Sequence, residues 1–369
     1  MRNKLTMRTM RHAGLAAIAI CVLASCGNDG PGAPGPGGPT RTFRMGFSPI
    51  PPKPDIFVLF AALEMWTQRA DAGILHVELP WDSLLAGVRA DTLVRRDPLG
   101  VANYYRAKGL EVVVTLDATN GLDRASEAPA LVAAGRSLTE PEVQAAFRAY
   151  AVATDTILRP LYMGLVAETN LIRAATAVMG ADSIYDAVVA AANGAAADIR
   201  AVDAGATLTV SVQVETAWGA LQGTGGYEGI ATDLADFPFV QALGLSPYPY
   251  LGGFADPDSV PLDYYARIAE EAALPVLVVE GGWTSVDVGA VVSTPEKQAR
   301  YIRRHAALLD SARAVGVFQL TFADFDLSSL PPPVPPNLEF FAYLGLVDKD
   351  LVPKPALAVW DSVFALPRE

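Results

Sequence analysis

The stretch Leu274-Pro-Val-Leu-Val-Val-Glu-Gly-Gly-Trp283 has a counterpart far upstream in Leu161-Tyr-Met-Gly-Leu-Val-Ala-Glu-Thr-Asn170. Each is a continuous apolar run that ends in a glutamate, Glu280 in the first and Glu168 in the second. A continuous rather than alternating run predicts a strand buried on both faces, as in parallel sheets covered by helices. A carboxylate at the carboxyl end of such a strand leaves the core and faces the mouth of the sheet. We therefore expect both carboxylates at one edge of a parallel α/β fold.

Similar apolar runs recur along the chain and alternate with helical patterns. The expected strands end near Ser48, Glu78, Asp117, Glu168, Glu215, Ser246, Glu280 and Thr321. Helical patterns lie at residues 54–70, 98–108, 139–157, 182–204, 263–272 and 295–315. Alternation predicts a parallel sheet, and eight strands can close a barrel. The predicted fold class is α/β, a single (β/α)8 TIM barrel over residues 41–369. A doubly wound open sheet is the competing fold, disfavoured because no glycine-rich phosphate loop follows the first strand.

The first 25 residues are typical of a targeting segment. A basic region containing Arg2, Lys4, Arg8 and Arg11 precedes a short apolar run, which ends in Leu23-Ala24-Ser25-Cys26. The apolar run is too short to span a bilayer comfortably. Its end resembles the lipobox of bacterial lipoproteins, which implies cleavage before Cys26 and lipid attachment to the Cys26 sulfur. An ordinary secretory signal is the alternative.

Residues 26–40 are rich in glycine and proline and are expected to form a linker that holds the folded domain away from a membrane. We therefore expect a lipid-anchored protein of the bacterial cell envelope, with membrane contact through the lipid alone. The outer membrane is favoured because Gly27 is not the usual inner-membrane retention residue. An exported protein is the alternative.

Composition excludes several classes of function. Removal of residues 1–25 leaves 24 Lys+Arg against 40 Asp+Glu, and such an acidic surface argues against nucleic-acid binding. The only cysteines are Cys21 and Cys26, so the folded domain has neither a disulfide nor a thiol nucleophile. With three histidines and no metal-binding motif, neither a metal nor another cofactor is expected. We expect a monomer.

The two glutamates suggest a chemistry. The ends of the fourth and seventh strands of an eight-stranded barrel face each other across the mouth, so Glu168 and Glu280 should converge. Convergent carboxyl groups can hydrolyse a glycosidic bond, with retention when they lie about 5 Å apart and with inversion at about 6.5–9.5 Å. We predict the shorter separation. A solvated carboxylate or half of a structural ion pair is the alternative for each.

Further motifs resemble a known family. Val279-Glu280-Gly-Gly-Trp283 is similar to the strand-seven nucleophile motif of the clan A glycoside hydrolases, which are (β/α)8 barrels. Gly244-Leu-Ser-Pro-Tyr-Pro-Tyr250 is similar to the strand-six segment of the family 53 endo-β-1,4-galactanases, and Phe341 to Leu357 resembles the closing segment of many barrel glycosidases. The resemblance covers residues 43–365. It implies a retaining hydrolase of a β-linked polysaccharide or oligosaccharide that works by two-glutamate double displacement.

The same resemblance implies roles for individual residues. Glu168 would be the acid/base and Glu280 the nucleophile, with Tyr248 holding Glu280 by its hydroxyl. The family's asparagine before the acid/base is replaced by Ala167, so Asn170 is the expected substitute. Phe322 would replace the usual strand-eight tryptophan platform. The other expected substrate-binding residues follow strands: Trp81, Asp117, Glu215, Trp218 and Trp283.

The departure at Ala167 keeps a second class of protein open, a non-catalytic carbohydrate-binding barrel lipoprotein. A barrel hydrolase that uses a metal at its mouth is a further alternative. The sugar, its linkage and endo or exo action also stay open.

Overall fold

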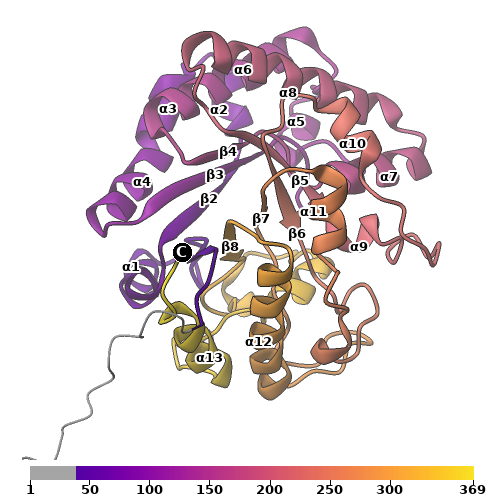
Figure 1. The fold of residues 1–369 in the computed structure, drawn as a ribbon. Helices are drawn as coiled ribbons and strands as arrows, with labels where there is room; N and C mark the ends of the chain where they lie inside the picture. Colours follow the sequence, from indigo (N-terminus) through magenta and orange to yellow (C-terminus); the bar gives the residue numbers. More distant parts are fainter. Residues whose placement is uncertain (1–38) are drawn as a thin grey trace, which may run out of the picture. The chain divides into compact units, whose positions relative to one another are not determined.

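The computed structural model describes residues 39–369, which contain a closed barrel of eight parallel strands. Each strand pairs with the next along the chain, and β8 pairs with β1 to complete the ring. The strands are β1 Arg44–Phe47, β2 Ala72–Glu78, β3 Glu111–Asp117, β4 Tyr162–Gly164, β5 Leu208–Gln213, β6 Ala242–Ser246, β7 Val276–Val278 and β8 Gly316–Gln319 (Figure 1). The predicted fold class, α/β with a single (β/α)8 TIM barrel, is confirmed.

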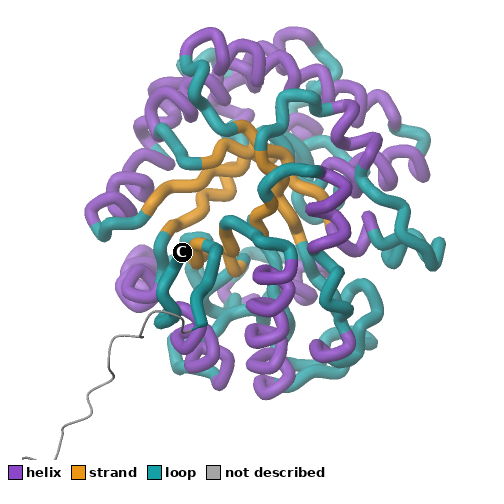
Figure 2. The backbone as a smooth tube through the Cα atoms, viewed as in Figure 1, coloured by secondary structure: helices purple, strands orange, loops and turns teal. Residues whose placement is uncertain are grey.

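Helices connect the strands and lie outside the ring, as Figure 2 shows. The α-helices are α1 Ile56–Trp66, α2 Trp81–Leu85, α3 Ala90–Arg96, α4 Pro98–Ala107, α5 Pro129–Ala133, α6 Pro141–Leu158, α7 Thr169–Met179, α8 Asp182–Val202, α9 Val214–Ala217, α10 Ala231–Asp236, α11 Ala266–Ala272, α12 Pro295–Ser311 and α13 Pro355–Phe364. Short 3-10 helices are η1 Thr67–Arg69, η2 Pro257–Ser259, η3 Leu327–Ser329 and η4 Pro336–Phe341. The six predicted helical segments correspond to α1, α4, α6, α8, α11 and α12.

Strand ends agree with the sequence pattern at some positions and differ at others. β2, β3 and β6 end at the predicted residues, whereas β4 ends at Gly164, well before Glu168. The residues between them, Leu165, Val166 and Ala167, are buried although they lie outside the strand. An apolar run therefore indicates that residues are buried, but it does not show that they pair in a strand. Glu168 lies in the turn that begins α7 instead of at the end of β4.

The strands are buried on both faces, which explains their continuous apolar sequences. A small cluster fills the barrel interior and consists of Ala72, Ile74, Val113, Ala242, Leu277, Val279 and Phe318. A much larger apolar cluster lies between the sheet and the helices. Because side chains alternate along a strand, the inward series that starts at Ala72 and Ile74 continues to His76 and Glu78. These last residues of β2 therefore lie at the mouth, above the packed interior.

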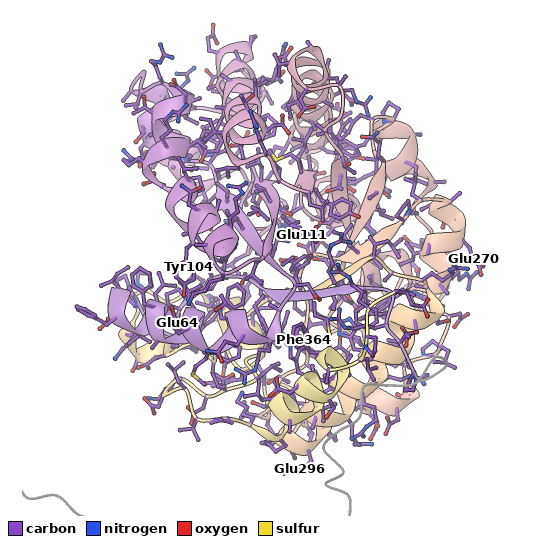
Figure 3. All side chains as sticks on the ribbon, turned by 60° about the vertical axis from the view of Figure 1, so that its left-hand side comes forward. Glu64, Tyr104, Glu111, Glu270, Glu296 and Phe364 are labelled. Carbon is purple, nitrogen blue, oxygen red and sulfur yellow. The ribbon has the colours of Figure 1, made fainter. Side chains whose placement is uncertain are left out.

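The amino end of the barrel is closed by polar contacts. Arg44 at the start of β1 pairs with Glu111 at the start of β3, and Arg41 pairs with Asp71 at 2.7 Å. The Arg41 guanidinium also lies 5.1 Å from the ring centre of Phe364 in α13 (Figure 3 labels Glu111 and Phe364).

No helix within residues 39–369 is long and apolar enough to cross a bilayer. The predicted signal segment, Cys26 and residues 26–38 of the linker lie outside the described residues.

A close approach between β1 and β2 gives a test of barrel packing. A Cβ added at Gly46 would overlap the carbonyl oxygen of Ala72, a backbone atom that cannot move without disturbing the sheet. We expect Gly46→Ala to lower the free energy of unfolding by about 1–3 kcal/mol, measured by urea denaturation. Gly100→Ala in the exposed part of α4 is the matched control, because nothing lies within 4 Å of its added Cβ. The control should stabilise by about 0.5–1 kcal/mol, and equal effects of the two changes would contradict this packing.

Candidate active site

A cavity of about 500 Å³ opens at the carboxyl end of the barrel. Its lining includes Asp117 from β3, Glu168 after β4, Tyr248 after β6 and Glu280 after β7. Two further cavities adjoin it and share lining residues with it. One, of about 470 Å³, is lined by Glu78, Trp81, Asp117 and Asn120 among others, and the second, of about 320 Å³, includes Glu168, Tyr248 and Leu251. We call these three cavities together the cleft.

Glu168 is buried, and its backbone is held in an unusual conformation. It precedes α7 with φ 53° and ψ 50°, the left-handed region that a residue with a Cβ rarely adopts. Its N–H donates to the Ser211 hydroxyl on β5 at 2.9 Å. Residues in such conformations persist where surrounding contacts fix them, and they gather at functional sites. The turn thereby directs the Glu168 carboxyl group into the cleft.

A buried arginine that the sequence pattern did not predict connects two of the cleft carboxylates. The Arg124 Nε donates to Glu168 Oε2 at 2.9 Å. Its Nη1 donates to both carboxylate oxygens of Asp117, at 2.9 and 2.7 Å, and to the Thr119 hydroxyl at 3.2 Å. Arg124 is only 7% exposed, so these charge-assisted bonds lie in a poorly screened environment. Arg124 therefore fixes the positions of Asp117 and Glu168 together.

Glu280 lies two residues beyond β7 and is half-buried. The Ser246 hydroxyl at the end of β6 donates a hydrogen bond to its Oε1. The glycine that follows, Gly281, approaches the Pro247 carbonyl so closely that a Cβ there would lie 2.6 Å from that oxygen, which explains a glycine after the carboxylate. The β6 and β7 ends together set where the Glu280 carboxyl group lies.

The Glu168 and Glu280 carboxyl groups influence each other's proton affinity. Burial, followed by the negative charge of Glu280, raises the pKa of Glu168 to about 7, against the lowering effect of Arg124. Burial also raises the pKa of Glu280, whereas the Arg124 charge and the hydrogen bond from Ser246 lower it. Because the Glu280 charge raises the pKa of Glu168, the state in which one carboxyl group is protonated and the other ionised is favoured over the doubly ionised state.

Tyr248 lines the cleft as predicted, but the hydrogen bond on Glu280 comes from Ser246 instead. Among the described residues, no hydrogen bond joins the Tyr248 hydroxyl to Glu280. The Tyr248 backbone N–H donates to Glu215 at 2.9 Å, and the Tyr264 hydroxyl donates to the same carboxylate at 2.8 Å. Glu215 is fully buried and does not line the cleft. It therefore anchors the segment after β6, a structural role in place of the predicted contact with substrate.

Asn170 also has a structural role. Its amide nitrogen donates to the Gln213 carbonyl at 2.9 Å, and its amide oxygen accepts from the Gln213 N–H at 2.8 Å. Both ends of the amide are occupied in joining α7 to β5, so the expectation that Asn170 replaces the missing asparagine beside Glu168 is not supported. Ala167 lines the cleft at that position.

Three of the aromatic residues predicted to bind substrate lie away from the cleft. Trp283 is fully buried and donates its indole N–H to the Ser293 hydroxyl, while Phe322 packs edge-on against Phe47 in the core. Trp218 stacks on Tyr264 with ring centres 5.3 Å apart and donates to the Tyr264 carbonyl. An aromatic residue just after a strand can pack against a helix as readily as it can face a sugar, and these three pack.

Trp81 does line the cleft, together with aromatic residues that the sequence pattern did not single out. They are Phe325, Phe340 and Phe341, from the segments after β8 and in η4. Asn337 in η4 donates to the Leu122 carbonyl at 2.6 Å, so this segment reaches the loop after β3 across the cleft. Phe341 is the first residue of the segment Phe341 to Leu357, so the resemblance of that segment to barrel glycosidases could have indicated that Phe341 lies at the site.

His76 and Asp324 are two further titratable groups near the mouth of the barrel. His76 contacts the Val279 carbonyl oxygen at 3.0 Å, and burial lowers its pKa to about 4, so its ring is neutral near neutral pH. Asp324 is paired with Lys354. Within residues 39–369, no group of three or more His, Cys, Asp or Glu side chains is placed to hold a metal ion.

Comparisons with known proteins agree with the fold. No protein-family model matches the sequence, and no curated protein does. Among solved structures, an exo-β-1,4-mannosidase from Opitutaceae bacterium strain TAV5 is similar over 88% of this chain and 59% of its own length, with a TM-score of 0.64 and 18% identity. The GH53 catalytic domain from Ignisphaera aggregans is similar over 91% of this chain and 99% of its own length, with a TM-score of 0.58 and 17% identity.

A β-D-glucuronidase from Dictyoglomus thermophilum is similar over 88% of this chain and 51% of its own length, with a TM-score of 0.54 and 14% identity. The chain thus spans between half and three-fifths of the mannosidase and glucuronidase, and nearly all of the GH53 domain. At these identities the likeness establishes the shared barrel fold.

The raised pKa of Glu168 predicts a pH-dependent stability. Stability from this group is fully present below the ordinary pKa of 4.5 and is lost as pH rises through about 7, because the folded protein must then bury a charge. Glu168→Gln cannot ionise, so from pH 5 to pH 8 it should lose on the order of 2 kcal/mol less stability than the wild type. Urea unfolding at both pH values measures this difference. Glu142→Gln on the surface of α6 is the control, and a wild-type-like pH dependence in Glu168→Gln would contradict the assignment.

Proposed function

We propose that this protein is a glycoside hydrolase that cleaves a β-linked polysaccharide or oligosaccharide with retention of configuration. The observation that carries the proposal is that two carboxyl groups, those of Glu168 and Glu280, line one cavity at the mouth of the barrel, where burial raises the pKa of both. The solved structures with the same fold support it, since two are named as glycosidases and one as a GH53 catalytic domain.

The two carboxyl groups supply complementary chemistry. Glu280 in its ionised form attacks the anomeric carbon, and the glycosidic C–O bond breaks as Glu168 donates its proton to the leaving oxygen. A water then attacks the same carbon, Glu168 accepts its proton, and the ester bond to Glu280 breaks. A pKa of about 7 suits a group that gives and takes a proton near neutral pH. Ser246 holds Glu280 in place for the attack.

Substitution of each carboxylate tests the two roles. Glu280→Gln should abolish hydrolysis because no covalent intermediate can form. Glu168→Gln should lower kcat by roughly 10²–10⁴-fold, with the largest loss for substrates whose leaving oxygen most needs a proton. Reducing-sugar release from a panel of β-linked polysaccharides measures both, and NMR of the first-formed product reports retention. Folded, fully active Glu280→Gln would reject the nucleophile assignment.

A second candidate function is a carbohydrate-binding barrel without turnover. Ala167 favours it, because the side chain expected to bind a sugar hydroxyl is missing and Asn170 does not replace it. Saturable binding of a polysaccharide fragment, without product from any member of the same panel, would identify this function instead. We further propose that the protein is a monomer and, from residues 1–40, that it is lipid-anchored in the bacterial cell envelope.

Arg124 gives a test through the pH profile of hydrolysis. Its positive charge lowers the pKa of both Glu168 and Glu280. Arg124→Met should therefore move both limbs of the bell-shaped profile of kcat/KM to higher pH, by about one unit or more, and lower its maximum. Arg124→Lys keeps the charge and should move the limbs less. Arg148→Met, which removes a surface ion pair with Asp198, should leave the profile in place. An unmoved profile in Arg124→Met would rule out this influence.

A further inference from the structure

The cavity of about 320 Å³, which we call the side cavity, lies beside the proposed acid/base and away from the proposed nucleophile. It shares Glu168, Arg124 and Tyr248 with the central cavity. Glu280 lines the central cavity and neither of the adjoining ones. The acid of a two-carboxylate hydrolysis protonates the leaving oxygen, so the leaving group lies on the side of the acid. The side cavity is therefore placed to receive the leaving group of the substrate.

Leucine and phenylalanine side chains from five segments line the side cavity. The segments are α7, η4 and the loops after β3, β5 and β6, and the side chains are Leu122, Leu171, Leu221, Leu251, Phe340 and Phe341. Leu221 is 40% exposed and the other five are half-buried. Apolar side chains that converge on one cavity while still partly in water are stabilised when an apolar group covers them.

The polar side chains of the side cavity are already engaged within the protein. The Gln213 amide is hydrogen-bonded at both ends within the turn from β5 to α9, and the Asn337 amide nitrogen donates to the loop after β3. Both oxygens of the Asp123 carboxylate accept hydrogen bonds within their own loop, and Arg124 is bound to the cleft carboxylates. A sugar would lose the hydration of its hydroxyl groups here and find few partners for them, which is costly.

The other adjoining cavity, of about 470 Å³, has groups that suit a sugar. The ring of Trp81 lines it, and an aromatic ring can pack against the apolar face of a pyranose. The amide nitrogen of Asn120 makes no hydrogen bond within residues 39–369, so it can donate to a sugar hydroxyl. The two adjoining cavities therefore suit different parts of one substrate.

We propose that the substrate is a β-linked oligosaccharide joined to an apolar alcohol, with the alcohol in the side cavity and the sugars in the other two cavities. This inference rests on the proposed glycosidase function and names its substrate class. The bond that breaks joins the first sugar to the alcohol oxygen. Glu280 forms its bond to the anomeric carbon as the alcohol leaves with the proton of Glu168, and water then releases the sugar from Glu280.

Leaving groups of matched length test this preference. The purified full-length protein is assayed on the octyl and the 3,6-dioxaoctyl β-glycosides of the β-1,4-linked disaccharides of glucose, mannose and galactose, below their micelle concentrations. The two chains have the same length, but oxygens replace methylene groups in the second. We expect kcat/KM for the octyl glycoside to exceed that for the dioxaoctyl glycoside by about tenfold. The corresponding trisaccharide, whose leaving group is a sugar, should also be cleaved more slowly than the octyl glycoside.

Variants of Leu221 identify the cavity responsible. Leu221→Gln should lower the octyl-to-dioxaoctyl ratio of kcat/KM by about threefold, while Leu221→Met, which stays apolar, should retain most of it. Leu262→Gln makes the same chemical change at an exposed leucine that lines none of the three cavities, and it should leave the ratio as it is in the wild type. A ratio near one in the wild type, or an unchanged ratio in Leu221→Gln, overturns the inference.

The same substrates separate this inference from the proposed function. Equal rates on the octyl, dioxaoctyl and sugar leaving groups would leave the proposed function standing and overturn the inference alone. If nothing is hydrolysed, the proposed function fails, and calorimetric titration with the octyl and dioxaoctyl glycosides decides whether the side cavity holds an apolar group. Tighter binding of the octyl glycoside, weakened in Leu221→Gln, would support such a site, and equal binding of the two, or none, would overturn it.

Discussion

The site depends on the hydrogen bonds and ion pairs that one buried guanidinium makes with its neighbours. Arg124 lies between Asp117 at the end of β3 and Glu168 at the start of α7, and it is almost completely shielded from water. A buried charge is tolerated only where its partners have good geometry, and removal of one partner leaves an expensive orphan. Asp117, Arg124 and Glu168 are therefore mutually required, and the loop after β3 is tied to the strand-four turn by the same bonds.

This dependence limits how the carboxyl group of Glu168 can behave. Burial and Glu280 favour its protonated form, whereas Arg124 favours its ionised form, and the balance leaves its pKa at about 7. The left-handed backbone of Glu168 adds a conformational cost that its contacts with Ser211 and Arg124 must offset. Free energy that could have stabilised the fold is thus spent on placing a carboxyl group whose protonation can change near neutral pH.

The sequence was a good guide to the barrel and to two carboxylates, for a clear physical reason. Strands buried on both faces must be apolar throughout, so a glutamate after such a run is conspicuous. Arg124 has no such pattern, because it lies in an irregular polar loop and its Glu168 partner is 44 residues away.

The positions of the aromatic residues were visible in the sequence, but the direction of their side chains was not. Trp81 reaches the cleft, whereas Trp283, Phe322 and Trp218 pack beneath or beside it. The two glycines after Glu280 turn the backbone before Trp283, so its ring enters the core between Tyr250 and Tyr301. Position after a strand is therefore a weak guide to the direction of a large side chain, since one turn of backbone changes which face it meets.

Both ends of the described domain meet at the pole opposite the cleft. The Arg41 N–H donates to the Pro367 carbonyl, and the Glu369 N–H donates to the Arg41 carbonyl, beside the ion pair of Arg41 with Asp71. If the protein were attached to a bead or an electrode through either of these ends, the surface would lie at the amino end of the barrel. The carboxyl end, with the cleft, would then face the bulk solution. The same adjacency makes the domain a suitable scaffold for circular permutation, because a short peptide could join the two ends without crossing the cleft.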